Sequence, residues 1–159
     1  MAIQLQLTVN GADRLRRGLS NAPDSVASET RSAMTQSLVL LEADQRRNVA
    51  QDTRRLMGSI SHRIEGGGAN ITGHVGPSAR YAYWVEHGRR PGKQPPVQAV
   101  SGWARRHGID PFLLARAIGR RGTRAQPFVL PSWTRNRNSI LTIFRRIGVR
   151  VAARVVGGR

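Results

Sequence analysis

Residues 3–9 alternate strictly between apolar and polar side chains. Ile3, Leu5, Leu7 and Val9 share one face, and this period of two is typical of a strand with one buried face. The pattern therefore predicts an N-terminal strand over residues 3–9.

A helical period follows over residues 22–50. Pro23 suits the first turn of a helix, and Asp24 is favourable at the positive end of the helix dipole. Small and medium-sized side chains then recur about every 3.6 residues. They are Val26, Thr30, Ala33, Met34, Ser37, Leu38 and Leu41. This stripe predicts one long helix with a single packing face.

The period returns to two over residues 58–87. Ile60 and Ile64 share one face of a predicted strand, and the glycines at 66–68 provide the turn into a second strand. Alternation in Tyr81–Glu86 predicts a third strand. We expect an antiparallel sheet here, with the long helix packed over its apolar face.

The rest of the chain predicts helices. Residues 95–121 contain two short amphipathic stretches separated by Gly108, which indicate a helical insertion. We expect Val100 and Trp103 on the inner side of the first helix, and Leu113, Leu114, Ala117 and Ile118 on the inner side of the second. Residues 127–155 predict an extended segment bracketed by Pro127 and Pro131, followed by a C-terminal helix that begins at Trp133. That helix has an apolar side formed by Ile140, Phe144, Ile147 and Val151. The predicted fold is a single α+β domain over residues 1–159.

The charge is strongly basic and unevenly distributed. The chain has 159 residues and 26 basic against 9 acidic side chains, a net charge of +17. Acidic and basic residues balance over residues 1–52, so residues 53–159 carry the whole excess. Such a field attracts polyanions or acidic proteins.

Composition excludes several classes of function. The chain has no cysteine, which excludes disulfides, thiolate zinc sites and cysteine nucleophiles. It has no apolar run long enough to span a membrane, and its first residues lack the features of a secretory signal. We therefore expect synthesis in the cytoplasm and no membrane partner.

Catalysis finds no support in the sequence. It has no nucleophile elbow, phosphate loop or dinucleotide-binding glycine motif. His62, His74, His87 and His107 are not spaced as metal ligands, and we expect a satisfied core histidine at His62. Glu86 is interpreted as one half of a structural ion pair with an arginine. A ribonuclease would require a His/Glu/Arg cluster, which the predicted strand does not form because its adjacent positions point to opposite faces. We expect no enzyme activity, cofactor or metal.

Several arginine pairs could contact nucleic acid or acidic proteins. They are Arg105 with Arg106, Arg120 with Arg121, and Arg145 with Arg146. No zinc finger, basic zipper or RNA-binding strand motif accompanies them. Binding to DNA would therefore be directed to the backbone and steeply dependent on salt. A solvated face, or a surface against acidic neighbours, is the alternative interpretation for each pair.

Three segments resemble one protein family. Asp52–Ile60 resembles its junction aspartate-threonine-glycine-x-leucine-x-x-serine-isoleucine, with Arg54 in the place of the glycine. Tyr81–Gly88 is similar to its strand tyrosine-alanine-x-tyrosine-valine-glutamate-phenylalanine-glycine, with His87 in the place of the phenylalanine. Gly122–Pro131 is similar to its segment glycine-threonine-x-alanine-x-proline-phenylalanine-leucine-x-proline. The family is that of the tail-component proteins of long-tailed bacteriophages, which are neck or tail-completion proteins.

The resemblance implies a structural virion protein at the head–tail junction. It implies a homo-oligomeric ring, hexameric or dodecameric, between the head connector or head-closure protein and the tail terminator or tail tube. Strand addition by residues 3–9 and by Pro127–Pro131 could join neighbouring subunits. The residues expected at subunit or partner interfaces are Tyr83, Trp84, Arg89, Arg90, Phe128 and Trp133. The alternative function is a free, non-specific nucleic-acid-binding protein that uses its arginine-rich part.

Overall fold

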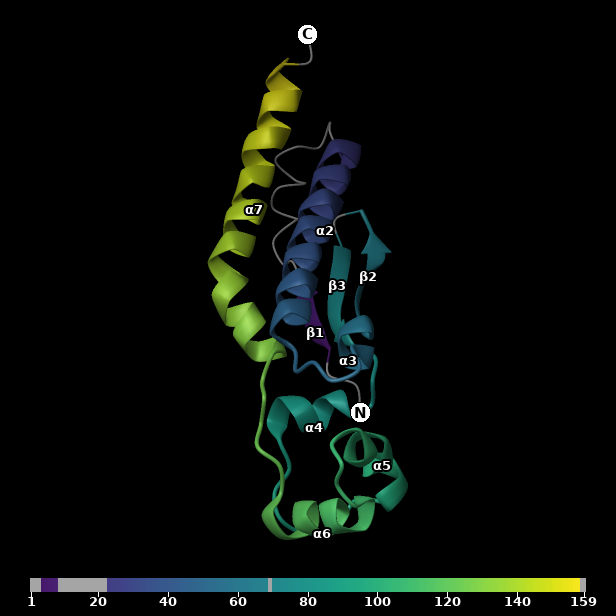
Figure 1. The fold of residues 1–159 in the computed structure, drawn as a ribbon. Helices are drawn as coiled ribbons and strands as arrows, with labels where there is room; N and C mark the ends of the chain where they lie inside the picture. Colours follow the sequence, from purple (N-terminus) through teal and green to yellow (C-terminus); the bar gives the residue numbers. More distant parts are fainter. Residues whose placement is uncertain (1–3, 9–22, 69, 158–159) are drawn as a thin grey trace. The chain divides into compact units, whose positions relative to one another are not determined.

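The computed structural model describes residues 4–8, 23–68 and 70–157 (Figure 1). Ile3 and Val9 of the predicted N-terminal strand lie outside the described residues. The chain forms two compact units, where the sequence pattern predicts one domain. We call them the first unit, which comprises residues 1–80 and 128–159, and the second unit, which comprises residues 81–127.

The sheet of the first unit has three antiparallel strands in the order β1-β3-β2. These strands are β1 (Leu5–Thr8), β2 (Ile60–Gly67) and β3 (Asn70–Pro77). β2 and β3 form the predicted hairpin, in which Ile64 faces Gly73. β1 pairs with the other side of β3, where Leu5 faces Val75. The N-terminal strand therefore completes the sheet of its own chain.

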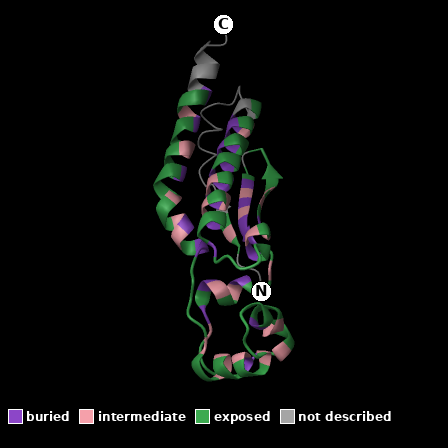
Figure 2. Cartoon of the chain, in the orientation of Figure 1, coloured by how far each residue is buried: buried purple, intermediate pink, exposed green. Residues whose placement is uncertain are grey.

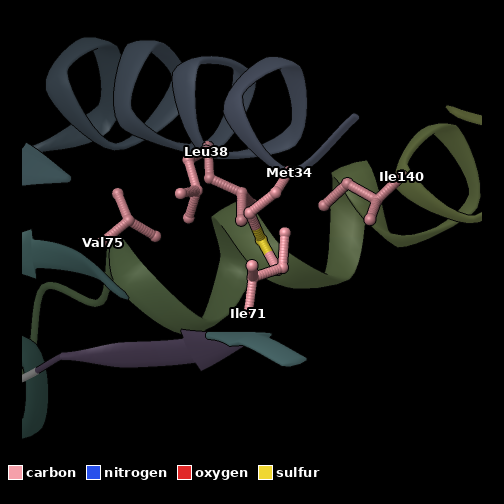
Figure 3. Close-up of a cluster of buried hydrophobic side chains, with 6 residues drawn as sticks. Met34, Leu38, Ile71, Val75 and Ile140 are labelled. Atoms are coloured by element: carbon pink, nitrogen blue, oxygen red, sulfur yellow. The ribbon is translucent and has the colours of Figure 1, made fainter. Parts of the chain in front are cut away.

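Two long helices accompany this sheet. They are α2 (Pro23–Asn48) and α7 (Val129–Gly157), and α2 contacts both the sheet and α7. The apolar stripe of α2 provides Met34 and Leu38, which lie against β3 on one side and Ile140 of α7 on the other (Figure 3). Gly73 of β3 permits this close approach, because a Cβ there would lie 2.6 Å from the Met34 sulfur. This arrangement confirms the α+β fold with a long helix on a small sheet.

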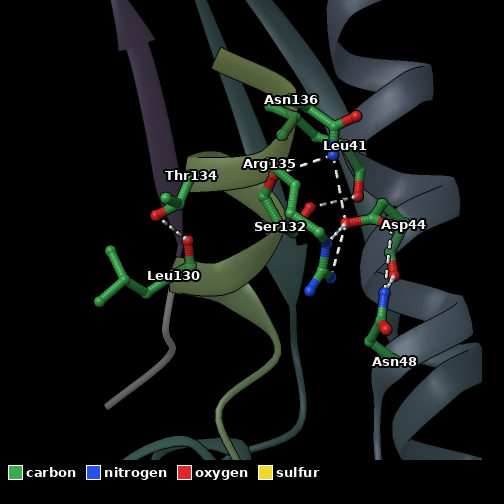
Figure 4. A network of polar contacts seen from close by, with 8 residues as sticks. All are labelled: Leu41, Asp44, Asn48, Leu130, Ser132, Thr134, Arg135 and Asn136. Atoms are coloured by element: carbon green, nitrogen blue, oxygen red, sulfur yellow. Dashed lines mark hydrogen bonds and ion pairs between the residues drawn. The ribbon is translucent and has the colours of Figure 1, made fainter. Parts of the chain in front are cut away.

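Polar contacts also hold α7 to α2 (Figure 4). The Asp44 carboxylate of α2 accepts hydrogen bonds from Arg135 Nη2 at 2.9 Å and from Asn136 Nδ2 at 3.1 Å. Burial alone would raise the pKa of Asp44, but the hydrogen bond and charge of Arg135, with Ser132 and Asn48, outweigh it. The pKa of Asp44 therefore lies below its ordinary value of 3.8.

The second unit consists of three short helices. They are α4 (Ala82–His87), α5 (Val97–Arg106) and α6 (Pro111–Arg121), and α5 packs against α6. The two ends of the unit are joined by a backbone bridge between Arg89 and Thr123. Gly122 precedes this bridge at φ +72°, where a Cβ would lie only 1.9 Å from the Arg89 carbonyl oxygen. The tight passage of the chain at this point therefore requires glycine.

The predicted strand over Tyr81–Glu86 is wrong, because these residues form α4. Alternation along this segment fits a strand, but Ala82 and Glu86 are the buried positions, and their spacing of four residues is helical. β1 supplies the third strand of the sheet instead. The matching strand that the family resemblance implies at Tyr81–Gly88 is corrected in the same way.

Two further boundaries differ from the predictions. The extended segment at Pro127–Pro131 is wrong in its second half, since α7 begins at Val129 rather than at Trp133. Pro131 falls in the first turn of α7, where a missing N–H breaks no helical hydrogen bond. Before β2, a single helical turn, α3 (Arg55–Gly58), replaces the expected start of the strand at residue 58.

In the part of the chain that the structure describes, no helix is both long and apolar enough to cross a bilayer.

Candidate interaction surface

The two units bury very different side chains. Figure 2 colours the chain by how far each residue is buried. Within residues 81–127, all of which the structure describes, the buried hydrophobic residues are Ala82, Ala104 and Ala115. Six large apolar side chains of the same unit are exposed instead. They are Tyr81, Trp84, Trp103, Ile109, Phe112 and Leu113. The second unit therefore presents to solvent the side-chain types that are enriched at the centres of protein interfaces.

The first part of this surface lies on α4 and the loop that follows it. The ring of Trp84 is 48% exposed and packs edge-on against Tyr83, with 5.1 Å between the ring centroids. The Arg89 guanidinium carbon lies 5.3 Å from the centre of the Trp84 ring, a cation–π geometry. Arg90 follows and is exposed. The structure thus brings together three of the predicted interface residues, Tyr83, Trp84 and Arg89.

Arg89 is held firmly in this position. Its backbone N–H donates to the Thr123 carbonyl at 3.0 Å and its carbonyl accepts from the Thr123 N–H at 2.8 Å. The Arg89 guanidinium also donates to the Lys93 carbonyl. The side chain of Arg89 therefore starts from a fixed backbone, which reduces the entropy lost when a partner binds.

A second aromatic pair lies on α5. Trp103 and His107 stack with 3.9 Å between ring centroids and 15° between planes. His107 Nδ1 lies 2.9 Å from the Trp103 carbonyl oxygen, so this nitrogen carries a proton and donates. Trp103 had been expected to face inward in its helix, but it is 41% exposed.

The third part is the outer face of α6. The helix begins at Asp110, whose carboxylate accepts a hydrogen bond from the Leu113 N–H at 2.9 Å. Ala115 is buried on the inner side, while Phe112 and Leu113 are 54% and 58% exposed. Arg120 and Arg121 are exposed in the last turn of the same helix. The residue spacing within Pro111–Arg121 is compatible with this exposed face. The sequence analysis placed Leu113 on the inner face of the helix, and that prediction is wrong.

The predicted arginine pairs are all exposed. Arg105 and Arg106 end α5, and Arg120 and Arg121 end α6, so these four belong to the second unit. Basic side chains are favourable at these positions because the C-terminus of a helix carries the negative end of its dipole. Arg145 and Arg146 lie within α7 of the first unit.

Two predicted interface residues belong to the interior instead. The Phe128 side chain is fully buried, and Trp133 is partly buried against the core cluster that contains Met34 and Leu38. A neighbouring subunit could not reach the ring of Phe128 in this conformation. Prolines on both sides of a segment are typical of an extended tether. Here Pro127 and Pro131 instead flank the buried start of α7. Glu86 is also buried, where a carboxylate requires a partner, and its ion pair with an arginine stays a prediction.

The histidines and carboxylates of the first unit form structural contacts. His62 Nδ1 contacts Glu42 Oε2, and Arg46 Nη2 lies 2.7 Å from Glu42 Oε1. Arg46 also donates to the Ile60 carbonyl at 2.7 Å, which ties α2 to β2. Among the residues that the structure describes, no group of three or more His, Asp or Glu side chains is placed to hold a metal ion.

We compared the chain with protein families, with curated proteins and with solved structures. No family model, curated protein or solved structure matches it. Any function of the chain must therefore be inferred from its sequence, its fold and the exposed surface of the second unit.

Proposed function

We propose that this chain is a structural subunit of the head–tail junction of a long-tailed bacteriophage. In this role it assembles with copies of itself into a ring and contacts the proteins of the head connector and the tail. The proposal extends the resemblance of Asp52–Ile60, Tyr81–Gly88 and Gly122–Pro131 to the tail-component family. Its site of action is the virion, and it needs no cofactor.

The observation that carries the proposal is the composition of the second unit. Its buried hydrophobic residues are alanines, while its tryptophans and Phe112 are exposed. A short unit that buries so little apolar surface gains little stability by itself, and association with another protein would bury the rest. This arrangement supports a role in assembly.

A second observation concerns the junction before β2. Arg54 adopts a left-handed conformation with φ +57°, and it is the one non-glycine residue with positive φ among the described residues. Such a conformation favours glycine because a Cβ is strained there. The family resemblance expects a glycine at this position, so the backbone supports the alignment of this block although the side chain departs from it.

A ring subunit needs two different surfaces, one for each neighbour. The exposed Trp84 ring on α4, with Arg89 of the loop that follows, offers one. The outer edge of the sheet offers another, because β2 pairs with β3 alone within the described residues. β1 pairs within its own chain, so this strand is already used in the described sheet.

The basic charge also supports a second candidate, the free nucleic-acid-binding protein. All three predicted arginine pairs are exposed, as phosphate contacts require. The two functions predict opposite results. A ring protein assembles by itself and keeps its oligomers at moderate salt, while the free protein stays a monomer and loses DNA between about 50 and 200 mM salt.

Sedimentation velocity and negative-stain electron microscopy of the purified chain test the proposal. We expect ring-shaped particles whose fraction rises with protein concentration, and peptides of this chain in purified virions. Trp84→Ala should lower the assembled fraction without lowering the melting temperature, because the ring is 48% exposed. Trp84→Phe, the matched control, should retain part of the assembly. A monomer at every concentration, absent from virions, would contradict the proposal.

A further inference from the structure

Apolar and basic side chains are unevenly distributed along the outer face of α6. Side chains four residues apart lie on one line along a helix. One line runs from Phe112 through Arg116 to Arg120, and the adjacent line runs from Leu113 through Ala117 to Arg121. All six residues are exposed. Both lines are thus apolar in the first turn and basic in the last.

We propose that this α6 face is a docking surface for a different protein, one that presents an apolar pocket beside a cluster of carboxylates. Phe112 and Leu113 would enter the pocket, and Arg120 and Arg121 would pair with the carboxylates. The inference rests on the proposed function, because it names the chemistry of one neighbour of the ring.

Among the residues that the structure describes, charge complementarity disfavours a second copy of the chain as the natural occupant. Four of the acidic residues that the structure describes, Glu29, Glu42, Asp44 and Glu86, are buried or nearly so. The first three lie beside arginines of their own chain. Among the described residues, these four carboxylates are therefore not available to α6 of another copy.

The exposed acidic residues do not change this conclusion. Glu65 lies 2.7 Å from Arg63 Nε, and Asp110 caps α6 itself. Asp24 lies in the first turn of α2 and Asp52 follows its other end, and this 26-residue helix is about 39 Å long at 1.5 Å per residue. Among the described residues these groups do not form the compact acidic cluster that two adjacent arginines would fit.

The same geometry disfavours duplex DNA and a lipid surface. Phosphates would pair with Arg120 and Arg121, but they offer nothing to Leu113, whose aliphatic side chain neither stacks on bases nor gains from the backbone. A helix that lies in a bilayer surface needs an apolar stripe along its whole length. On α6 the large apolar side chains of this face, Phe112 and Leu113, lie in the first turn, and Arg116 follows Phe112 on its line.

The backbone supports α6 as a rigid platform. The helix is capped by Asp110 at its start, and its end is fixed by the hydrogen bond from the Gly122 N–H to the Ile118 carbonyl at 2.8 Å. On the inner side, the Gly92 N–H donates to the Gly119 carbonyl at 2.8 Å. A partner would therefore meet side chains whose positions are already set, which favours affinity.

The test uses the whole chain and two labelled helical peptides built from leucine, glutamate and alanine. In the matched peptide, leucines occupy one end of a face and glutamates the other end. In the control peptide, the same residues are interleaved. Fluorescence anisotropy measures binding at moderate salt, with duplex DNA and phosphatidylglycerol vesicles as competing probes. We expect the matched peptide to bind more tightly than the control peptide, and neither competitor to displace it.

Two double variants should each weaken binding of the matched peptide about tenfold or more. They are Phe112→Ala with Leu113→Ala, and Arg120→Glu with Arg121→Glu. Arg145→Glu with Arg146→Glu on α7 changes the net charge equally and should leave binding within about twofold. A matched peptide with lysines in the place of the glutamates should bind the Arg120→Glu, Arg121→Glu variant and not the original chain. This reversal is independent of any loss of stability.

Equal effects of the α6 and α7 charge reversals would overturn the proposal, because they would show attraction by net charge alone. Tighter binding to DNA or vesicles than to the matched peptide would also overturn it. Ring formation is measured separately for the same variants. Rings without binding of the matched peptide would refute the docking surface and leave the proposed function, whereas a chain that forms no rings would refute the proposed function.

Discussion

The two units of the chain use their apolar residues in opposite ways. In the first unit, Met34, Leu38 and Ile140 are withdrawn almost completely from solvent. In the second unit, alanines fill the interior while Trp84 and Phe112 are exposed. Because a buried leucine contributes about 1.5–3 kcal/mol and an alanine much less, the first unit holds most of the stability. The second unit holds most of the surface that is suited to contact.

The basic residues of the two units also differ in the acidic partners that their own unit provides. In the first unit, Arg46 and Arg135 lie within hydrogen-bonding distance of Glu42 and Asp44 of their own chain. In the second unit, nine basic side chains are accompanied by Glu86 and Asp110 alone. Arg46 and Arg135 of the first unit thus help to hold the fold. Basic residues exceed acidic ones in both units, by 17 to 7 in the first and by 9 to 2 in the second, so the ratio is higher in the second unit and suits it to acidic partners.

The largest expected effect comes from comparing a buried leucine of the first unit with an exposed leucine of the second. Leu38→Ala removes a fully buried side chain and leaves a cavity, so it should lower the free energy of unfolding by about 4 kcal/mol. Leu113→Ala, the matched change at a side chain that is 58% exposed, should lower it by less than about 0.5 kcal/mol. Urea denaturation followed by circular dichroism measures both. Similar losses in the two variants would contradict the comparison.

The second unit should depend on its backbone more than on its side chains. Gly122→Ala forces a Cβ against the Arg89 carbonyl and should cost about 2–3 kcal/mol in local stability. Gly108→Ala is the control, since Gly108 has φ +66° but nothing within 4 Å of an added Cβ, and it should cost about 1 kcal/mol. Hydrogen exchange should show lost protection at Arg89 and Thr123 in the first variant. Protection that stays unchanged there would show that the bridge is unimportant.

A third effect tests the polar link between α2 and α7. The folded pKa of Asp44 lies below 3.8, so its ionised form adds stability above this pH and loses it as the pH falls through the folded pKa. Asp44→Asn should therefore lower the free energy of unfolding by about 1–2 kcal/mol near neutral pH. The gap to the original chain should close under acid conditions. Urea titrations at stepped pH measure it, and a gap that is constant with pH would rule out the charge as its cause.

Much of the first unit could be predicted from the sequence. The stripe that begins at Val26 predicted a helix over residues 22–50, and α2 runs over Pro23–Asn48. Alternation and the glycines at 66–68 predicted the hairpin of β2 and β3. These elements have one buried face each, so the period of their apolar residues directly reflects their secondary structure.

The second unit was harder to predict because its burial does not follow large apolar residues. In α4 the buried positions are Ala82 and Glu86. Of the aromatic residues between them, Tyr83 is half-buried and Trp84 is exposed. Reasoning that places large apolar side chains inside therefore assigns the wrong period. The same cause concealed the exposed face of α6, where Leu113 was expected to point inward. At Phe128 the opposite error occurred, since a residue expected at an interface is fully buried.

The smallest expected effect concerns strain in the well-packed unit. Arg54 holds φ +57°, which costs a residue with a Cβ about 1–2 kcal/mol. Arg54→Gly relieves this strain, although the added freedom of the unfolded chain returns about 0.4–1 kcal/mol. We therefore expect the free energy of unfolding to rise by about 0.5–1 kcal/mol. Arg55→Gly, in the adjacent helical turn, has no such strain to relieve and should lower it by about 1 kcal/mol.

Opposite signs at adjacent arginines would locate the strain at one backbone position, and urea denaturation at high protein purity resolves a difference of this size. A loss of stability in Arg54→Gly would mean that the left-handed turn is not populated in solution. The alignment of Asp52–Ile60 with the glycine-containing junction would then lose its structural support. A gain would mean that the first unit is stable enough to tolerate an arginine at a position that favours glycine. The exposed position of the Arg54 side chain leaves it available for another contact.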